Sequence, residues 1–321
     1  MDYVSFGNTG LKVSVAGLGC GGSSRLGAGH GYSEDHSVGI VLKAFDHGVT
    51  LLDTAQAYGT ESIVGKAVAQ LSRDQVVISS KFKGGRGKNI LSENEVVSAV
   101  DSSLAALGTD YIDIYNLHAV VIEEYDLLLD RVVPVLLREK EKGKIRHIGI
   151  TEAGPRDHEH KMLRRAVDDG PFESIAVAYN MMNQLAHREV LPRARDKGIG
   201  SMVMFAVRAV FSVPGRLKAD VQSRVAAGDL PQWMAEKDNV LDFLLHPGGA
   251  DSIIDAAYRY VRHKWCTDVI LFGTGNVAHL EANIASLLRP PLPEADVERL
   301  EELFGHLAGF GADMPEPTVR S

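Results

Sequence analysis

The sequence contains little cysteine and few aromatic residues. Cys20 and Cys266 are the two cysteines among 321 residues, and aromatic residues make up 7% of the chain. Two cysteines cannot form a disulfide framework, and they show none of the spacings typical of metal-ligating residues. The chain is therefore expected to fold around an apolar core in a reducing compartment, without a structural metal ion.

Long apolar runs and a positive N-terminal segment are also missing. No stretch of about 18 apolar residues is present, so the sequence indicates no membrane-spanning helix. The opening residues, MDYVSFGNTG, lack the positive charge and the apolar run of a secretory signal peptide. A formal net charge of −8 disfavours a nucleic-acid partner. Together these features predict a soluble cytoplasmic protein.

Short apolar runs alternate with longer helical patterns along most of the chain. The runs are mostly too unbroken in hydrophobicity to be half-exposed, which is typical of parallel strands buried on both faces. They cover residues 13–18, 50–53, 76–80, 112–116, 145–150, 174–178, 201–205 and 268–272. This series of βα units predicts an α/β fold of the (β/α)₈ TIM-barrel type, as a single domain over residues 1–321.

An open, doubly wound sheet is the alternative architecture. Such a sheet usually carries a glycine-rich turn after its first strand, and this turn opens directly into a helix. The segment GLGCGG at residues 17–22 resembles this turn, but it lacks the G-x-G-x-x-G spacing and an immediate helix. The barrel is therefore favoured, with a β-hairpin around Asn8-Thr9-Gly10 before its first strand.

One long segment of the chain shows no repeating pattern. Residues 206–250 contain scattered glycine and proline and are expected to form a long loop after strand seven. A connection of this length usually has a function, such as covering a binding site. The segment is thus either a lid over the active site or an insertion without a role in binding.

Polar side chains stand at the C-terminal ends of neighbouring strands, where barrel enzymes carry their active sites. Asp53 ends the second strand, Lys81 follows the third, and His118 follows the fourth. Tyr58 lies in the loop after the second strand. Each residue alone has an ordinary structural explanation, such as a helix cap or a packing contact. Their joint occurrence on one rim predicts a catalytic site.

The chemistry of these four groups is coherent. A phenol has an ordinary pKa near 10, which is too high for easy proton exchange near neutrality. The Lys81 ammonium favours the phenolate of Tyr58, and the Asp53 carboxylate keeps the lysine charged and oriented. His118 can hydrogen-bond the oxygen that changes charge. The group predicts a general acid for a carbonyl being reduced, or a base for an alcohol being oxidised.

These segments resemble the signature blocks of the aldo-keto reductase family. DTAQAYG, SSKF and YIDIYNLH place the family's Asp-Tyr-Lys-His tetrad on the four residues above. GKIRHIGI, FGNTGLKVSVAGLGCGG and LFGTGNVAHLEANIAS also resemble family segments. The resemblance implies a barrel that binds NAD or NADP across its rim, and hydride transfer coupled to proton transfer through Tyr58. It implies a carbonyl or alcohol as the substrate.

The resemblance also implies which residues contact the cofactor. The loop after the last strand leads into a helix N-terminus, which suits a phosphate. In NADP-preferring members, Lys or Arg often stands at the positions that match Gly273 and His279, and neither is strongly basic here. NAD is therefore slightly favoured, and Arg208 or another distant cation would reverse this preference. The expected contacts are Gly21, Asp53, Thr151, Glu152, Met204, Phe205, Val207, Arg208, Gly273, Thr274, Gly275, Asn276, His279 and Asn283.

The nicotinamide end departs from the family pattern. Thr151 and Glu152 stand where the carboxamide is usually held by Ser-Asn, and Ala176 replaces a Gln. Ionised Glu152 can accept from the amide but cannot donate. Met204 beside Phe205 replaces the stacking aromatic. The segment GITE is similar to the branch of L-galactose and L-fucose dehydrogenases, which implies oxidation of an aldose at its anomeric carbon, often with NAD.

Two other functions remain as alternatives. The first is a non-catalytic regulatory or binding subunit that senses the nicotinamide redox state on the same barrel. The second is a barrel lyase or isomerase that uses Lys81 in a Schiff base or a proton shuttle.

Overall fold

The barrel predicted from the apolar runs is present. The computed structural model describes residues 1–312. Parallel strands form a closed barrel in the order β10-β11-β12-β3-β4-β5-β8-β9, with β12 pairing with β3 to close it. The strands are β3 (Ala16–Gly19), β4 (Leu51–Asp53), β5 (Val77–Phe82), β8 (Ile112–Val120), β9 (Ile145–Glu152), β10 (Ser174–Ala178), β11 (Gly200–Met204) and β12 (Val269–Phe272). Closure excludes the open doubly wound sheet. The expectation of a single domain over the whole chain stays a prediction.

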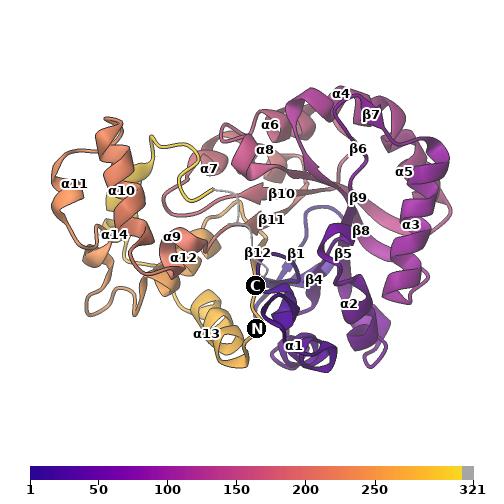
Figure 1. Cartoon of the computed structure of the whole chain (residues 1–321), viewed down its shortest axis with the longest axis horizontal. Helices are drawn as coiled ribbons and strands as arrows, with labels where there is room; N and C mark the ends of the chain where they lie inside the picture. The colour runs from indigo at the N-terminus through magenta and orange to yellow at the C-terminus, as the bar shows by residue number, and fades with distance from the viewer. Residues whose placement is uncertain (313–321) are drawn as a thin grey trace.

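Helices surround the barrel (Figure 1). The longer helices that follow its strands are α1 (Glu34–Asp46), α2 (Glu61–Val68), α3 (Glu93–Leu107), α4 (Ile122–Arg131), α5 (Val133–Glu141), α6 (Lys161–Asp169), α12 (Ile253–Arg262), α13 (Val277–Leu288) and α14 (Glu294–Phe304). Shorter helices are α7 (Leu185–Glu189) and α8 (Leu191–Asp196), with short 3₁₀ segments η1 (Arg25–His30), η2 (Gln56–Tyr58), η3 (Arg73–Gln75) and η4 (Gly154–Arg156). α3 begins with a capping box between Ser92 and Glu95, which satisfies N–H groups at its start.

The expected hairpin precedes the barrel. β1 (Tyr3–Ser5) pairs antiparallel with β2 (Lys12–Ser14). The apolar run over residues 13–18, which predicted one strand, is divided between β2 and β3. The reason lies at Ser14 and Thr50, where each backbone N–H bonds to the side-chain oxygen of the other residue at 2.9 Å. These side-chain bonds replace the ladder of the barrel at this point. A second short hairpin joins β6 (Gly85–Arg86) and β7 (Asn89–Ile90).

Apolar side chains fill the barrel near the beginnings of its strands. Barrel residues Leu51, Val77, Ile114, Ala176, Met202 and Val269 pack with Phe6 and Val13 from the hairpin segment. Ala176, which replaces the family's Gln, is therefore part of this core. Because the core and the hairpin occupy this end, polar side chains in the barrel gather at the opposite, C-terminal ends of the strands.

The connection after β11 is partly helical, unlike the long irregular loop that was expected. It contains α9 (Ala209–Ser212), α10 (Arg216–Ala226), α11 (Trp233–Glu236) and η5 (Asp242–Leu244). The sequence did carry a signal for α10, because Leu217, Val221 and Val225 recur every four residues on one helical stripe.

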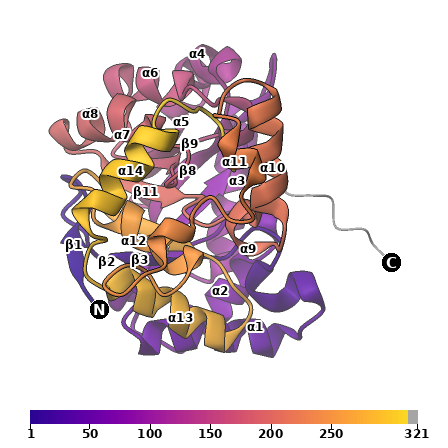
Figure 2. The same cartoon turned by 90° about the vertical axis from the view of Figure 1, so that its left-hand side faces the viewer.

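This connection packs against the C-terminal part of the chain. Arg224 of α10 donates to the Ala308 carbonyl at 3.2 Å, and His306 bonds to the Asp229 carbonyl at 2.8 Å. Figures 1 and 2 show α10 and α11 next to α14, to one side of the barrel. A role as a lid over the active site stays a prediction.

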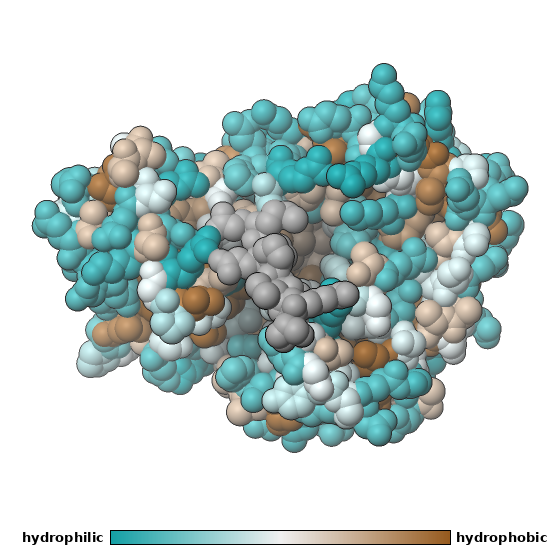
Figure 3. All heavy atoms as spheres, viewed as in Figure 1, coloured by the Kyte–Doolittle hydropathy of each residue, from teal (hydrophilic) through white to brown (hydrophobic). Residues whose placement is uncertain are grey.

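The surface is mostly hydrophilic. Figure 3 shows polar residues over much of the face seen in Figure 1, with small, scattered hydrophobic areas. Among residues 1–312, no helix has the length and apolar character needed to cross a membrane.

Candidate active site

The barrel brings Asp53 and Lys81 into direct contact. Lys81 Nζ donates to Asp53 Oδ2 at 2.7 Å and to the Thr54 carbonyl at 2.8 Å. Ser79, two residues before Lys81 on β5, donates to Asp53 Oδ1 at 2.9 Å. Both charged side chains are almost completely buried. Each carboxylate oxygen of Asp53 therefore has a donor, and the lysine is fixed by two acceptors.

Tyr58 and His118 complete the predicted group. Tyr58 Oη lies 3.4 Å from His118 Nε2, and the two rings meet edge to face with centroids 5.4 Å apart. Lys81 Nζ lies 5.0 Å from the centroid of the Tyr58 ring. Both Tyr58 and His118 are half-buried, whereas Asp53 and Lys81 are buried, so a substrate oxygen can reach the group from the side of Tyr58 and His118. The structure thus brings all four predicted residues together.

Gly21 determines where the Tyr58 ring lies. A Cβ atom on Gly21 would come within 2.5 Å of a Tyr58 ring carbon, which is closer than real Cβ contacts. The sequence predicted Gly21 as a cofactor contact. The structure adds a different reason for glycine here, because only a residue without a side chain leaves room for the ring.

Burial and charge act in opposite directions on the ionisable groups of the site. Burial raises the pKa of Tyr58, and it outweighs the nearby Lys81 charge, which acts to lower that pKa. This net direction is opposite to the lowering expected from the sequence. Burial also opposes the charged form of Lys81, but Asp53 and Tyr58 together raise the lysine pKa. The ammonium is therefore the stable form of Lys81.

His118 is held in its neutral form. Burial, assisted by the charges of Lys81 and Lys83, lowers the pKa of His118 to about 3. Its Nδ1 atom is buried and has no hydrogen-bond partner among the described residues. Of the two ring nitrogens of the neutral imidazole, Nε2 is the one that lies near the Tyr58 hydroxyl.

The loop between β12 and α13 fits a phosphate group. Asn276 caps α13 by accepting from the His279 N–H at 3.1 Å, and Thr274 Oγ1 accepts from the Asn276 N–H at 3.0 Å. Gly275 lies so close to Gly27 of η1 that a Cβ would come within 2.3 Å of the Gly27 Cα. The first turn of α13 is exposed and carries the positive end of a helix dipole. Several of the residues expected to contact the cofactor are open to solvent here. Gly273, Asn276 and His279 are exposed, and Asn283 is half-buried.

At the nicotinamide end, the expected contacts already have protein partners. Thr151 Oγ1 accepts from the Ala119 N–H at 2.8 Å, which leaves its hydroxyl proton to donate. Glu152 Oε1 accepts from the Ala178 N–H at 2.7 Å, and Oε2 lies 2.8 Å from Nδ1 of His160. Glu152 thus joins β9 to β10 and to the start of α6. Its contact with a carboxamide stays a prediction.

The Glu152–His160 pair was not foreseen. Both side chains are almost fully buried. Burial lowers the pKa of His160, but the adjacent carboxylate outweighs it, so the net direction is upward. Burial raises the pKa of Glu152 against the opposing effect of His160. The one signal in the sequence was a carboxylate at the end of a buried strand.

The residues after β11 form a compact group at the rim. Phe205 has a left-handed backbone with φ of 69°, which is uncommon for a residue with a side chain. The Arg208 guanidinium lies over the Phe205 ring, 4.1 Å from its centroid. Met204, Phe205, Val207 and Arg208 are all half-buried. The expected stacking residue and the expected cation are therefore in contact with one another.

Comparison with known proteins identifies the family. The sequence profile of the Aldo/keto reductase family matches residues 18–304. The chain belongs to the aldo/keto reductase family. It is 30% identical over 306 residues to the aldo-keto reductase YhdN of Bacillus subtilis, covering 88% of this chain and 87% of that protein. The chain is therefore an aldo-keto reductase, an oxidoreductase that acts on carbonyl compounds with NAD(P).

Two relatives with more specific names match a smaller part of the chain. The L-galactose dehydrogenase of Arabidopsis thaliana is 31% identical over 206 residues, which cover 62% of this chain and 63% of that protein. The NADH-specific methylglyoxal reductase of Escherichia coli is 31% identical over 220 residues, which cover 62% of this chain and 65% of that protein. These matches leave the branch of the family open.

A solved structure agrees with the fold. The holo form of the aldo-keto reductase AKR11C1 from Bacillus halodurans superposes with a TM-score of 0.69 at 21% sequence identity. The match covers 95% of this chain and 96% of that chain.

Proposed function

We propose that this aldo-keto reductase transfers hydride between NAD and a polyhydroxylated carbonyl or alcohol, including the anomeric carbon of an aldose. The observation that carries the proposal is the buried Asp53–Lys81 pair beside the Tyr58 and His118 side chains. Burying a charged pair carries a large desolvation cost, so its presence at this depth supports a functional role for the charge. Here that role is to set the proton affinity of the phenol.

In this proposal, Tyr58 carries the proton. Its Oη donates to the carbonyl oxygen during reduction and accepts from the hydroxyl during oxidation. The Lys81 ammonium stabilises the phenolate that remains after donation, and so partly offsets the effect of burial. Asp53 raises the pKa of Lys81 and thereby keeps the lysine charged through both half-reactions.

His118 orients the reacting oxygen. Because its pKa is lowered to about 3, the imidazole is neutral at physiological pH. A neutral Nε2–H can donate to the same oxygen that Tyr58 protonates, and so stabilise the developing alkoxide without competing for its proton.

When bound, a nicotinamide cofactor would supply or accept the hydride. The exposed N-terminus of α13, with Gly273, Asn276 and His279, would hold the phosphates. The hydroxyl of Thr151 can donate to the carboxamide. Phe205 and Met204 would line the ring.

The preference for NAD is supported by what stands at the phosphate end. Neither Gly273 nor His279 is a permanent cation, so a 2′-phosphate would lack its charge-assisted partners there. The Escherichia coli relative is an NADH-specific reductase, which supports this preference. The resemblance to the L-galactose dehydrogenase supports the aldose as substrate.

The geometry does not favour a Schiff-base enzyme. A Schiff base requires Lys81 as a neutral amine with an open approach to a carbonyl. Lys81 is buried, bonds to two acceptors, and has its pKa raised, so the nucleophilic form is disfavoured.

The test is a steady-state assay that follows NADH absorbance with L-galactose, L-fucose and methylglyoxal, in wild type and Tyr58→Phe. We expect turnover with at least one aldose in the wild type, and a loss of about 10²–10⁴-fold in the variant while NADH still binds. Near-normal turnover in the variant contradicts the role of Tyr58. Binding of NADH without turnover of any carbonyl favours the regulatory alternative.

A further inference from the structure

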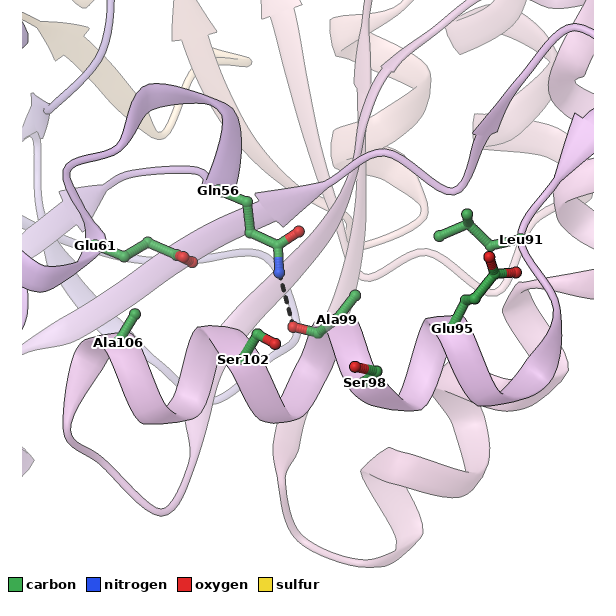
Figure 4. A pocket seen from close by; sticks show the side chains of 8 residues that line it. All are labelled: Gln56, Glu61, Leu91, Glu95, Ser98, Ala99, Ser102 and Ala106. Carbon is green, nitrogen blue, oxygen red and sulfur yellow. Dashed lines mark hydrogen bonds between the residues drawn. The ribbon is translucent and has the colours of Figure 1, made fainter.

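Gln56 and Tyr58 lie in the same 3₁₀ turn and point in opposite directions. Tyr58 points into the rim toward His118, whereas Gln56 points outward to the face of α3 (Figure 4). Gln56 Nε2 donates to the Ala99 carbonyl at 2.7 Å and to Ser103 Oγ at 3.0 Å. The amide therefore bonds the turn that carries Tyr58 directly to the middle of α3.

The acceptors of Gln56 belong to a closed polar cluster. Tyr115 of β8 donates to the Ala99 carbonyl at 3.2 Å, and its hydroxyl lies 3.1 Å from Ser103 Oγ. Ser103 and Tyr115 are fully buried. Burial raises the pKa of Tyr115, so the phenol keeps its proton and remains a donor. A buried network of this kind is costly to disturb, because a lost partner leaves the others unsatisfied.

This cluster contacts three of the elements that carry polar groups of the active site: the turn of Tyr58, the strand of Lys81 and the strand of His118. Tyr115 precedes His118 by three residues on β8. The Tyr115 ring stacks on Phe82, with centroids 5.1 Å apart and planes 6° from parallel. Phe82 follows Lys81 on β5. The cluster thus connects the turn of Tyr58 to the strands of Lys81 and His118.

The turn has few other supports at its tip. At its base, the hydroxyls of Thr54 and Thr60 bond to each other at 2.8 Å, and both residues are buried. At the tip, Ala57 is exposed, and a groove of about 570 Å³ opens between the turn and α3. Across this groove, the Gln56 amide provides hydrogen bonds between the tip and the helix.

We infer that Gln56 is a positioning residue, which holds the Tyr58 hydroxyl at the correct distance from Lys81 and His118 by bonding the turn to α3. This inference rests on the proposed role of Tyr58 in proton transfer. The N–H donors of the amide are essential, because the groups near Nε2 are all oxygen atoms. They are the Ala99 carbonyl, Ser103 Oγ and the Tyr115 hydroxyl. A carboxylate in its place loses both donors and adds charge to a groove that Glu61 and Glu95 already line.

The test compares Gln56→Met, which keeps the volume and removes the donors, with Gln56→Ala. Gln70→Ala is the matched control, because exposed Gln70 donates, among the described residues, only to the nearby Lys66 carbonyl. We expect kcat to fall about tenfold or more in both Gln56 variants, since a displacement of one ångström at a reacting group can cost up to about 10²-fold. The Kd for NADH should stay within about twofold of wild type, as it should in the control.

A double variant separates positioning from a general structural defect. If Gln56 acts through the phenol, adding Gln56→Met to Tyr58→Phe should lower the residual kcat by less than about twofold. An equal loss in both backgrounds, or no loss in the single variant, overturns the inference.

A second measurement does not depend on turnover. Hydrogen exchange of the peptide covering residues 54–60 should become faster in Gln56→Met than in wild type and Gln70→Ala. Unchanged exchange overturns the inference even if an active substrate is never found. If exchange is faster in Gln56→Met but no protein, including wild type, turns over any substrate, the proposed function is contradicted. The link between Gln56 and the turn then still holds.

Discussion

Lys81 Nζ lies 2.7 Å from Asp53 Oδ2, in a part of the barrel where these side chains are only 4% and 5% exposed. Removing two ions from water carries a large cost, which the pair recovers only if its geometry is good and its remaining polar atoms are satisfied. The Thr54 carbonyl and the Ser79 hydroxyl provide those further bonds. Replacing one partner alone leaves an isolated buried charge, which costs about 3–5 kcal/mol. Any kinetic test of this pair therefore needs a parallel measurement of stability.

The first prediction concerns Gly21, which makes room for the Tyr58 ring. Gly21→Ala should lower kcat by about 10- to 100-fold, because the new methyl group displaces the ring from His118. Steady-state kinetics, together with the midpoint of urea unfolding, provide the measurement. Gly39→Ala is the control, since a Cβ on Gly39 meets nothing within 4 Å. Equal kcat values in the two variants would show that the ring tolerates displacement.

The sequence predicted the strands and the tetrad because both follow from local patterns. A strand alternates its side chains, so the position of Lys81 on β5 also fixes Ser79 on the same side. The ends of parallel strands meet on one rim, which places Asp53, Lys81 and His118 together. No comparable rule connects Gln56 to Ala99, because that contact depends on the packing of a helix against a turn.

The same reason explains the other unforeseen features. Glu152 meets His160 because His160 adopts a left-handed backbone, with φ of 55°, at the start of α6. Such a conformation has no reliable signal in a residue other than glycine. The net rise in the pKa of Tyr58 depends on how deeply the ring is buried, which a motif does not encode.

The second prediction concerns cofactor choice. His279 is exposed in the first turn of α13, so His279→Arg supplies a permanent cation without disturbing the core. We expect kcat/KM for NADP(H) to rise by about tenfold, which corresponds to one charge-assisted hydrogen bond, with little change for NAD(H). Ala278→Arg is the control, because it adds the same charge to the same turn at the neighbouring exposed position. A wild type that already prefers NADP(H) tenfold contradicts the prediction and indicates another cation, first of all Arg208.

The third prediction concerns the buried Glu152–His160 pair. The folded-state pKa of His160 is raised above its unfolded value, so its contribution is fully present below pH of about 6.5 and is lost as pH rises through the folded pKa. Glu152, whose folded-state pKa is also raised, changes stability in the same direction. The free energy of unfolding should therefore fall with rising pH more steeply in wild type than in Glu152→Gln/His160→Gln, which removes both titrating groups.

Urea unfolding across this pH range measures that difference. His263→Gln is the matched control, because His263 is more exposed and its pKa is lowered rather than raised. Identical pH slopes in wild type and Glu152→Gln/His160→Gln would show that the pair does not bind protons differently on folding.

The last prediction concerns the effect of pH on hydride transfer. Oxidation needs Tyr58 as phenolate, so its kcat/KM should rise with pH, and reduction, which needs the phenol, should show the opposite trend. Burial raises the pKa of Tyr58 and the Lys81 charge opposes that rise. Lys81→Met should thus move the apparent pKa further upward and lower the oxidative rate at every pH below it.

Because the single variant leaves Asp53 as an isolated buried charge, Asp53→Asn/Lys81→Met is the stability-matched companion. Its upward shift should be smaller, since the Asp53 carboxylate itself raises the pKa of Tyr58 and is lost with the lysine. The measurement is kcat/KM against pH for the three proteins, with a deuterium isotope effect to show that hydride transfer limits the rate. If the apparent pKa stays the same in Lys81→Met, the titrating group is not Tyr58 under the influence of Lys81, and the proton reaches the substrate by another route, with His118 as the nearest candidate.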